Sequence, residues 1–94
     1  MLVIREIFVA KPGMASKLAK QFKEMTADMP GQKTRVMTDM VGNYNTVIME
    51  MEIESLAAFE KEMEKYSKAP KQEKEMASHT EMYLTGKREI FRLW

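Results

Sequence analysis

His79 is the only histidine in the sequence, and an imidazole is the one side chain that changes charge near neutral pH without a shifted pKa. It could act as a general base, a proton shuttle or an axial haem ligand. Tyr83 follows four residues later and would share a face with His79 if this segment is helical. The alternative is a histidine that faces solvent or makes a structural hydrogen bond, since no residue that would orient the imidazole can be identified from the sequence.

Charged residues lie among the apolar residues of the predicted strands. They are Glu6, Glu50, Glu52, Arg88 and Arg92. If the first strand lies between the third and the last, Glu6 can approach Glu50 on one side and an arginine on the other. Buried charges are costly unless they are paired, so two interpretations remain open. These charges either fix the alignment of two subunits or form the polar floor of a ligand cavity, with Glu50 as acid or base and Arg88 or Arg92 as an anion anchor.

Eleven of the 94 residues are methionine, and several fall on predicted core positions. Flexible thioethers can line a pocket that adapts to apolar ligands, and Met49 and Met51 are placed for this role. Plain core packing is the alternative. A copper site needs closely spaced, exposed methionines, which the pairs Met37 with Met40 and Met49 with Met51 do not provide.

Composition excludes several classes of protein. The 94 residues predict one domain over positions 1–94, and a net charge of +1 gives no field that would hold nucleic acid. Without cysteine there is no disulfide or thiolate nucleophile, and one histidine makes no metal site. No glycine-rich phosphate-binding loop is present, so we expect no cofactor. Arg5 interrupts the apolar start, and no apolar run is long enough to span a membrane, so we expect a cytoplasmic protein.

Alternating hydrophobicity predicts four strands, at residues 2–10, 34–41, 46–53 and 87–94. Lys11, Pro12 and Gly13 break the first run. Residues 41–45 (VGNYN) are typical of a tight connection between antiparallel strands, and Gly86 is expected to release the chain into the last strand.

Apolar residues at helical spacing predict two main helices. The first has a stripe that ends before Pro30 and Gly31, at Met14, Leu18, Phe22, Met25 and Met29. The second is capped by Ser55 and has a buried stripe at Leu56, Phe59, Met63 and Tyr66. Pro70 interrupts it, and residues 71–82 form either a shorter helix or a turn-rich connection.

The resulting order, β-α-β-β-α-β, predicts a ferredoxin-like α+β fold with both helices on one face of a four-stranded antiparallel sheet. Large apolar residues nevertheless occur on both strand faces. One expected set is Val3, Ile7, Val9, Met49, Met51, Phe91 and Leu93, and the other is Leu2, Ile4, Phe8, Ile48, Ile90 and Trp94. A monomer would leave one set in water, so we expect a homodimer through the exposed sheet face.

RNA-recognition domains share this topology, but their central strands carry basic and exposed aromatic residues. The third strand here reads VIMEMEI, which is acidic and has no aromatic residue. Nucleic acid is therefore not an expected partner.

Three segments resemble a known family: KPG at 11–13 before a helix that contains Phe22, SLAAF at 55–59, and GKREIFRL at 86–93. The chain resembles the dimeric α+β barrel superfamily, which includes NIPSNAP-like and antibiotic-biosynthesis-monooxygenase-like proteins. The resemblance implies that two sheets close into a barrel and that each subunit keeps a pocket between its sheet and helices. Phe22, Met49 and Met51 are then expected among the pocket residues.

The monooxygenases of this family use Asn, Trp and a His or Arg, whereas Asn43 and Asn45 here lie at a hairpin and Trp94 at the terminus. We therefore interpret the protein as a homodimer with a pocket for a small, mostly apolar molecule. The alternatives are a cofactor-independent monooxygenase or isomerase acting on a planar or carbonyl compound, a non-catalytic assembly module, and haem handling. Acid and base candidates are His79, Tyr83 and Glu50, and ligand-binding candidates are Arg88, Arg92, Glu6, Met49, Met51 and Phe22.

Overall fold

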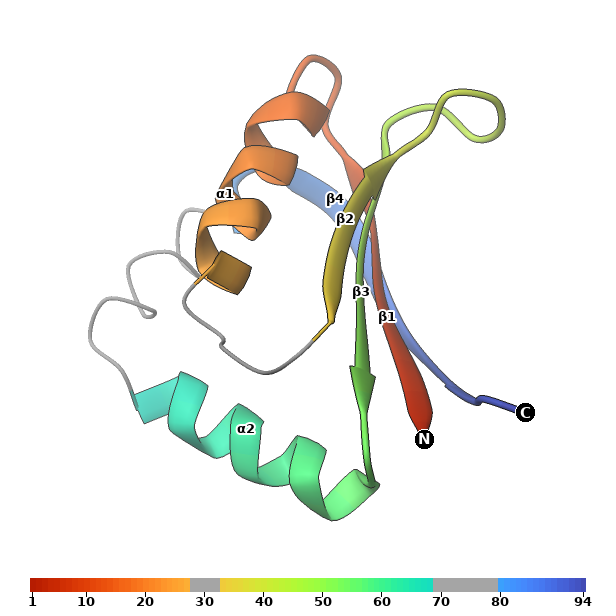
Figure 1. Cartoon of the computed structure of the whole chain (residues 1–94). Coiled ribbons are helices and arrows are strands. Elements are labelled where there is room, and N and C mark those ends of the chain that lie inside the picture. The colour runs from red at the N-terminus through yellow and green to blue at the C-terminus, as the bar shows by residue number, and fades with distance from the viewer. Residues whose placement is uncertain (28–32, 69–79) are drawn as a thin grey trace.

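The computed structural model describes residues 1–27, 33–68 and 80–94 (Figure 1). Its elements are β1 (Leu2–Ala10), α1 (Ala15–Ala27), β2 (Thr34–Thr38), β3 (Thr46–Ile53), α2 (Leu56–Lys68) and β4 (Tyr83–Arg92). The strands form one four-stranded antiparallel sheet in the order β2-β3-β1-β4. The predicted ferredoxin-like α+β fold is confirmed.

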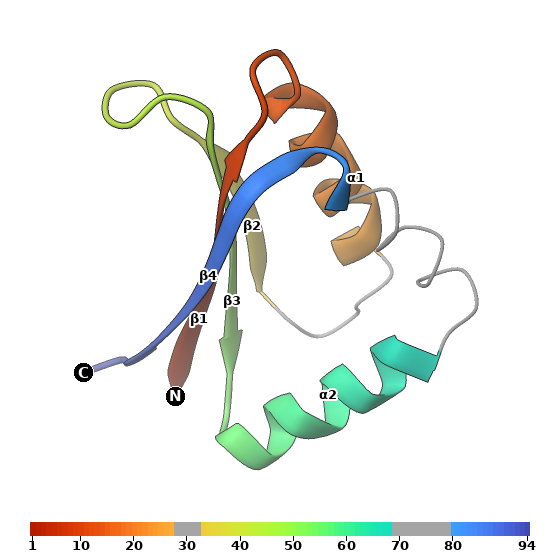
Figure 2. The same ribbon diagram turned by 180° about the vertical axis from the view of Figure 1, so that it is seen from behind.

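Both helices lie on the same side of the sheet, and we call this the helix side (Figures 1 and 2). The other side of the sheet is covered by no part of the described chain, and we call it the open face. The core lies on the helix side, where Ile4, Leu18, Phe22 and Val47 are fully buried between the sheet and α1.

The registers of β1 correct the predicted division of the apolar residues between the two faces. Arg5 pairs with Glu50 and Glu6 pairs with Met49, so Glu6 and Glu50 lie on opposite faces and do not approach each other. The helix side carries Leu2, Ile4, Phe8, Met49, Met51 and Ile90, and the open face carries Val3, Ile7, Val9, Ile48, Phe91 and Leu93. Side chains alternate between the two faces along each strand. This alternation does not determine which residues of neighbouring strands are paired, and a shift of one residue in the pairing would move each side chain of that strand to the other face.

The helices follow their predicted boundaries at the ends that the structure describes. In α1, Leu18, Phe22 and Met25 are buried, as the stripe predicted, while Met29 lies outside the described residues. The cap of α2 is confirmed, because the backbone N–H of Ala58 donates to Ser55 Oγ at 3.1 Å. None of the helices in the described ranges has the length and hydrophobicity needed to cross a membrane.

The β2–β3 connection is longer than predicted, because β2 ends at Thr38 rather than at residue 41. Asp39 Oδ1 accepts a hydrogen bond from the backbone N–H of Thr46 at 2.9 Å, which closes the loop. Asn45 has a φ of 64°, a left-handed conformation that asparagine tolerates better than most residues.

Strand β4 begins at Tyr83, earlier than the predicted start at residue 87, so Gly86 lies within the strand rather than before it. Gly86 pairs with Phe8, and a Cβ at Gly86 would lie 2.9 Å from two carbons of the Phe8 ring. That ring also packs against Phe22 and Tyr83, with centroid distances of 5.1 and 4.8 Å. The glycine is therefore explained by close aromatic packing on the helix side.

We expect Gly86→Ala to lower the free energy of unfolding by about 1–3 kcal/mol, because the added methyl group overpacks against Phe8. Without such a contact, replacing a strand glycine by alanine is favourable, because it reduces the entropy of the unfolded chain. Urea denaturation at a fixed protein concentration measures the change. The control is Lys17→Ala at an exposed position of α1, which we expect to stay within about 0.5 kcal/mol of wild type. Equal stability of Gly86→Ala and wild type would contradict this packing argument.

Candidate functional site

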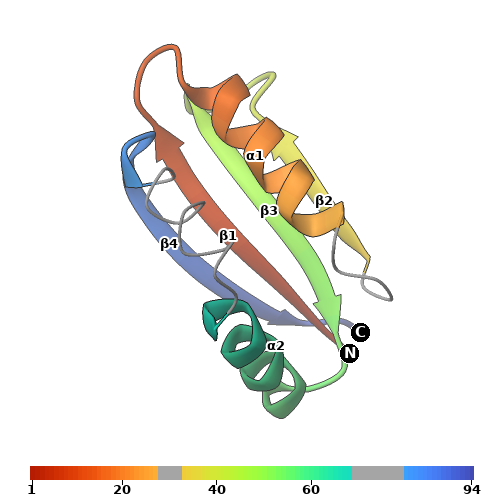
Figure 3. The same ribbon diagram turned by 90° about the vertical axis from the view of Figure 1, so that its left-hand side faces the viewer.

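A groove separates α2 from β4 on the helix side. Helix α2 leaves the end of β3 and runs away from the sheet, whereas α1 lies along β2 and β3 (Figures 1 and 3). The groove has a volume of about 720 Å³ and is lined by Leu56, Phe59, Glu60, Met63, Glu64 and Arg88. Its walls therefore come from one helix and from the strand that follows it in the element order.

The apolar stripe of α2 forms one wall of this groove. Phe59 is buried, but Leu56 is 56% exposed and Met63 is 38% exposed. The sequence predicted that all three would be buried. This is wrong for Leu56 and Met63, whose side chains line the groove instead of the core. Apolar side chains facing an open groove are available to contact an apolar ligand.

Arg88 provides the cationic part of the groove. Its guanidinium carbon lies 5.0 Å from the centroid of the Phe59 ring, a cation–π arrangement, and its Nε donates a hydrogen bond to Glu6 Oε1. The Glu6 side chain is 13% exposed, so the ion pair is partly shielded from water. The prediction that Glu6 meets an arginine of the last strand is confirmed, and this pair fixes a polar point beside the apolar wall.

A second cluster of charges lies on the open face. Arg5 Nε donates to Glu50 Oε1 at 2.8 Å, and Arg35 Nη2 donates to Glu50 Oε2. The Glu50 side chain is 5% exposed, because the two arginines cover it. Arg5 also lies over the Phe91 ring, 5.3 Å from its centroid.

These two arginines determine the ionisation of Glu50. Hydrogen bonds from Arg35 and then from Arg5 hold the pKa of Glu50 below its usual value, against the opposing effect of burial. The same contact with Glu50 raises the pKa of Arg35. Glu50 is therefore held as a carboxylate at neutral pH, which makes it a poor proton donor and a weak base.

A shallow hollow of about 790 Å³ lies next to this cluster at one end of the open face. Its lining residues are Val3, Arg5, Lys33, Thr34, Arg35, Glu50, Glu52, Phe91, Arg92 and Leu93. Arg92, which the sequence proposed as an anion anchor, belongs to this hollow and not to the groove beside α2.

Solved structures share this arrangement of sheet and helices. An uncharacterized NIPSNAP domain protein from Burkholderia xenovorans has a TM-score of 0.83 and 13% identity over 100% of this chain and 95% of that chain. For a NIPSNAP family protein from Agrobacterium tumefaciens str. C58 the values are 0.84 and 12%, covering 97% and 90%. The chain has the NIPSNAP-like fold. No protein-family model and no curated protein matches its sequence.

A mutant of SnoaB, a cofactor-independent oxygenase from Streptomyces nogalater, has a TM-score of 0.72 and 12% identity, covering 98% of this chain and 91% of that chain. The predicted resemblance to NIPSNAP-like and antibiotic-biosynthesis-monooxygenase-like proteins is therefore confirmed at the level of the fold.

Within the NIPSNAP-like fold, the predicted acid and base residues do not form one site. Glu50 lies on the open face, while Tyr83 is half-buried against Phe8 on the helix side. His79 lies outside the described residues, so its position relative to Tyr83 stays a prediction. Glu50 and Tyr83 are separated by the sheet, and they cannot act on one bound molecule.

The predicted ligand-binding residues divide in a similar way. Arg88 lines the groove beside α2, and Glu6 is its partner. Phe22, Met49 and Met51 are buried in the core and line neither of the hollows described above. The methionine pair thus packs the sheet against the helices, which was the alternative interpretation.

The groove-lining role of Leu56, Phe59 and Met63 was not predicted from the sequence, because their helical spacing predicted core positions for all three. Their helical spacing is the same whether the stripe packs on a sheet or faces a groove. No pattern in the sequence signals the angle between α2 and the sheet.

We expect Glu50→Gln to flatten the acid side of the stability profile. A carboxyl group whose pKa is lower in the folded state stabilises the fold above its unfolded pKa of about 4.5, and this contribution is lost as pH falls through the lower folded value. Wild type should lose stability more steeply than Glu50→Gln below that pH, and the difference should be constant near pH 7. Urea denaturation from pH 7 to pH 3 measures this, with Glu54→Gln as the exposed carboxyl control. Parallel profiles of wild type and Glu50→Gln would rule out the proposed shift.

Proposed function

We propose that this protein is a homodimer of NIPSNAP-like subunits that binds a small, mostly apolar molecule in the groove between α2 and β4. The observation that carries the binding proposal is the exposed apolar stripe of α2, which faces the groove opposite Arg88. A chain without cysteine is compatible with a reducing compartment, and the cytoplasm stays the expected location.

The dimer proposal rests on the open face. Val9, Phe91 and Leu93 are 36%, 44% and 52% exposed there, and Ile7 and Ile48 are half-buried. Arg5, Glu50 and Glu89 cross the face between Phe91 and Ile7. Burying the apolar side chains on both sides of these charges against a second sheet is favourable in proportion to their area. A second copy supplies an identical surface, so a symmetric pair buries both.

The properties of the ligand follow from the groove. Leu56, Phe59 and Met63 offer an apolar wall with a flexible thioether, which adapts to ligands of different shapes. The charge of Arg88 is largely balanced by Glu6, and Glu60 and Glu64 lie at the rim. This balance disfavours a strongly anionic ligand and favours a neutral apolar one with a polar group that can reach Arg88.

A catalytic role is the second candidate, favoured by the structural similarity to the oxygenase SnoaB. A cofactor-independent monooxygenase or isomerase would act on a planar or carbonyl compound in the same groove. Of its proposed acid and base residues, Tyr83 and His79 remain candidates, because Glu50 lies on the open face. If no reaction occurs, the same fold serves as a binding or assembly module.

We expect Ile7→Asp to convert the dimer into a monomer close to the 11.0 kDa mass of the chain. The carboxylate would be buried without a partner at the centre of the interface, weakening association by about a hundredfold or more. Native mass spectrometry and light scattering measure the mass. The control is Ser16→Asp on the exposed surface of α1, which should stay dimeric. Persistence of the Ile7→Asp dimer would contradict this interface.

We expect the purified dimer to retain a small extra mass, and Met63→Gln to reduce that retention while the dimer stays intact. Losing apolar contact worth about 1.4 kcal/mol weakens binding about tenfold. Native mass spectrometry detects the retained molecule, and titration with the dye 1-anilinonaphthalene-8-sulfonate measures the groove directly. Lys61→Gln, on an exposed part of the same helix, is the matched control. Dye binding that is the same in Met63→Gln and Lys61→Gln would place the ligand elsewhere.

A further inference from the structure

The loop between β2 and β3 presents apolar side chains to solvent. It spans residues 39–45 and extends beyond the end of the sheet (Figures 1 and 2). Met40 and Val41 are each 95% exposed, and Tyr44 is 87% exposed. In the part of the chain that the structure describes, none of the three belongs to the core or packs against it. Packing therefore does not explain why apolar residues occupy the tip of this loop.

Hydrogen bonds brace the base of the loop. The backbone N–H of Asp39 donates to the carbonyl oxygen of Thr46 at 3.2 Å, and the Thr46 hydroxyl donates to the carbonyl oxygen of Asn43 at 2.8 Å. Gly42, next to Val41, has a φ of 142°, a conformation that favours glycine. A braced loop loses less conformational entropy than a free one when its tip contacts a partner.

Two other segments lie beside the loop at the same end of the sheet. The backbone N–H of Ala10 donates to the carbonyl oxygen of Asn45 at 2.8 Å, and that of Lys11 donates to the carbonyl oxygen of Met82 at 2.9 Å. Helix α1 also begins at this end (Figures 1 and 3). The loop end, as we call it, comprises residues 10–20, 39–45 and 80–82.

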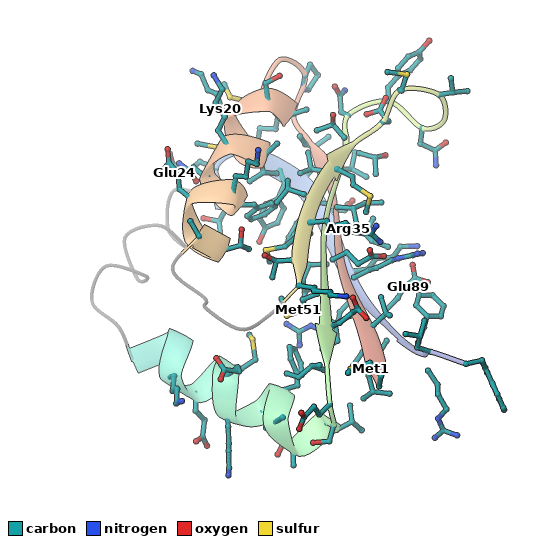
Figure 4. The ribbon with its side chains drawn as sticks, viewed as in Figure 1. Met1, Lys20, Glu24, Arg35, Met51 and Glu89 are labelled. Carbon is teal, nitrogen blue, oxygen red and sulfur yellow. The ribbon has the colours of Figure 1, made fainter. Side chains whose placement is uncertain are left out.

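The loop end has more cationic than anionic side chains. Its charged residues are Lys11, Lys17, Lys20, Asp39 and Glu81. All three lysines are exposed, and Figure 4 shows Lys20 closer to this end than Glu24. The Asp39 carboxylate is already used within the loop, because its Oδ1 accepts a backbone hydrogen bond at 2.9 Å. This end therefore combines an apolar tip with positively charged surroundings.

A lipid surface suits this shape better than a protein does. The tip projects from the molecule, so a protein partner would need a matching cavity. Three side chains also cover far less than the roughly 1,000 Å² that a stable protein interface buries. A membrane accepts a protruding tip without a preformed cavity. Tyrosine is favoured at the level of the head groups, and lysines near the surface are attracted to anionic lipids.

We propose that the loop end docks on an anionic lipid membrane. The side chains of Met40 and Val41 reach the boundary between head groups and acyl chains, Tyr44 lies among the head groups, and the lysines lie over anionic lipids. Insertion is shallow, because irregular backbone does not enter the hydrocarbon core, and attachment through so few apolar contacts is reversible. The inference goes beyond the proposed function, because none of these three side chains lines the groove beside α2.

Sedimentation with lipid vesicles tests the proposal. We expect wild type to bind vesicles made of phosphatidylcholine and phosphatidylserine in equal parts, and to bind pure phosphatidylcholine vesicles about tenfold more weakly. Raising the salt concentration should release the protein, because salt screens the attraction between lysines and head groups. A wild-type protein that binds neither kind of vesicle would overturn the proposal.

The double variant Met40→Ser/Val41→Ser removes the apolar tip. We expect its affinity for the mixed vesicles to fall about tenfold, and the fold to persist because both side chains are exposed. The matched control is Trp94→Ser, which removes a fully exposed aromatic ring at the opposite end of the sheet, beside Met1. This control should bind as wild type does. Full binding by the double variant, or loss of binding in Trp94→Ser, would contradict docking through the loop.

Charge reversal tests the contribution of the lysines. Lys11→Glu should weaken binding to the mixed vesicles about tenfold, whereas Lys61→Glu, on α2 away from the loop end, makes the same change in net charge and should have little effect (Figure 1). Equal losses in the two variants would show that net charge alone attracts the protein, and would overturn the proposed orientation. Met63→Gln should bind vesicles normally, which separates membrane docking from ligand binding in the groove.

A fluorescent label measures the depth of the tip, because the native chain has no cysteine. Val41→Cys labelled with a nitrobenzoxadiazole dye should gain fluorescence on the mixed vesicles and be quenched by lipids with brominated acyl chains. Lys61→Cys with the same dye should not change. Native mass spectrometry should give Met40→Ser/Val41→Ser the same assembly mass as wild type. A lower mass would assign the loop to a contact between protein chains and overturn the lipid proposal.

Discussion

Strand β1 is paired on both sides, and the registers of those two pairings decide the chemistry of each surface. With Arg5 opposite both Glu50 and Glu89, three charges line up on the open face. The same registers place Glu6 opposite Arg88 on the helix side. A shift by one residue in either pairing would bury the wrong side chains, so the contacts of the core and of the open face enforce each other.

The helix layer covers the sheet unevenly. Helix α1 packs along β2 and β3 and buries Leu18, Phe22 and Met25. Helix α2 contacts the sheet near its start, where Phe59 is buried, and it then diverges (Figure 1). The unequal packing creates the groove, because the apolar stripe of α2 continues past the point where the sheet can cover it.

The two sides of the sheet differ in how charged and apolar side chains are arranged, and they therefore suit different roles. On the helix side, a single shielded ion pair lies beside an apolar wall, which suits a small ligand. On the open face, alternating charges are embedded in an apolar surface, which suits a partner that matches both. The low pKa of Glu50 follows from its two arginines, and it assigns this carboxylate to the charge pattern of the open face rather than to proton transfer.

Much of this structure is determined by sequence patterns that act locally. The period of two in the strands, the stripe from Leu18 to Met25 and the cap at Ser55 specify the elements and their order, because each depends on residues close in sequence. The pairing of Glu6 with an arginine of the last strand also followed from that order. Tertiary structure alone decided the registers that exchanged Ile48 with Met49 and Met51 between faces, and the divergence of α2 that opened the groove. These depend on contacts between residues far apart in the chain, such as Phe8 over Gly86, and the same local pattern is compatible with more than one of them.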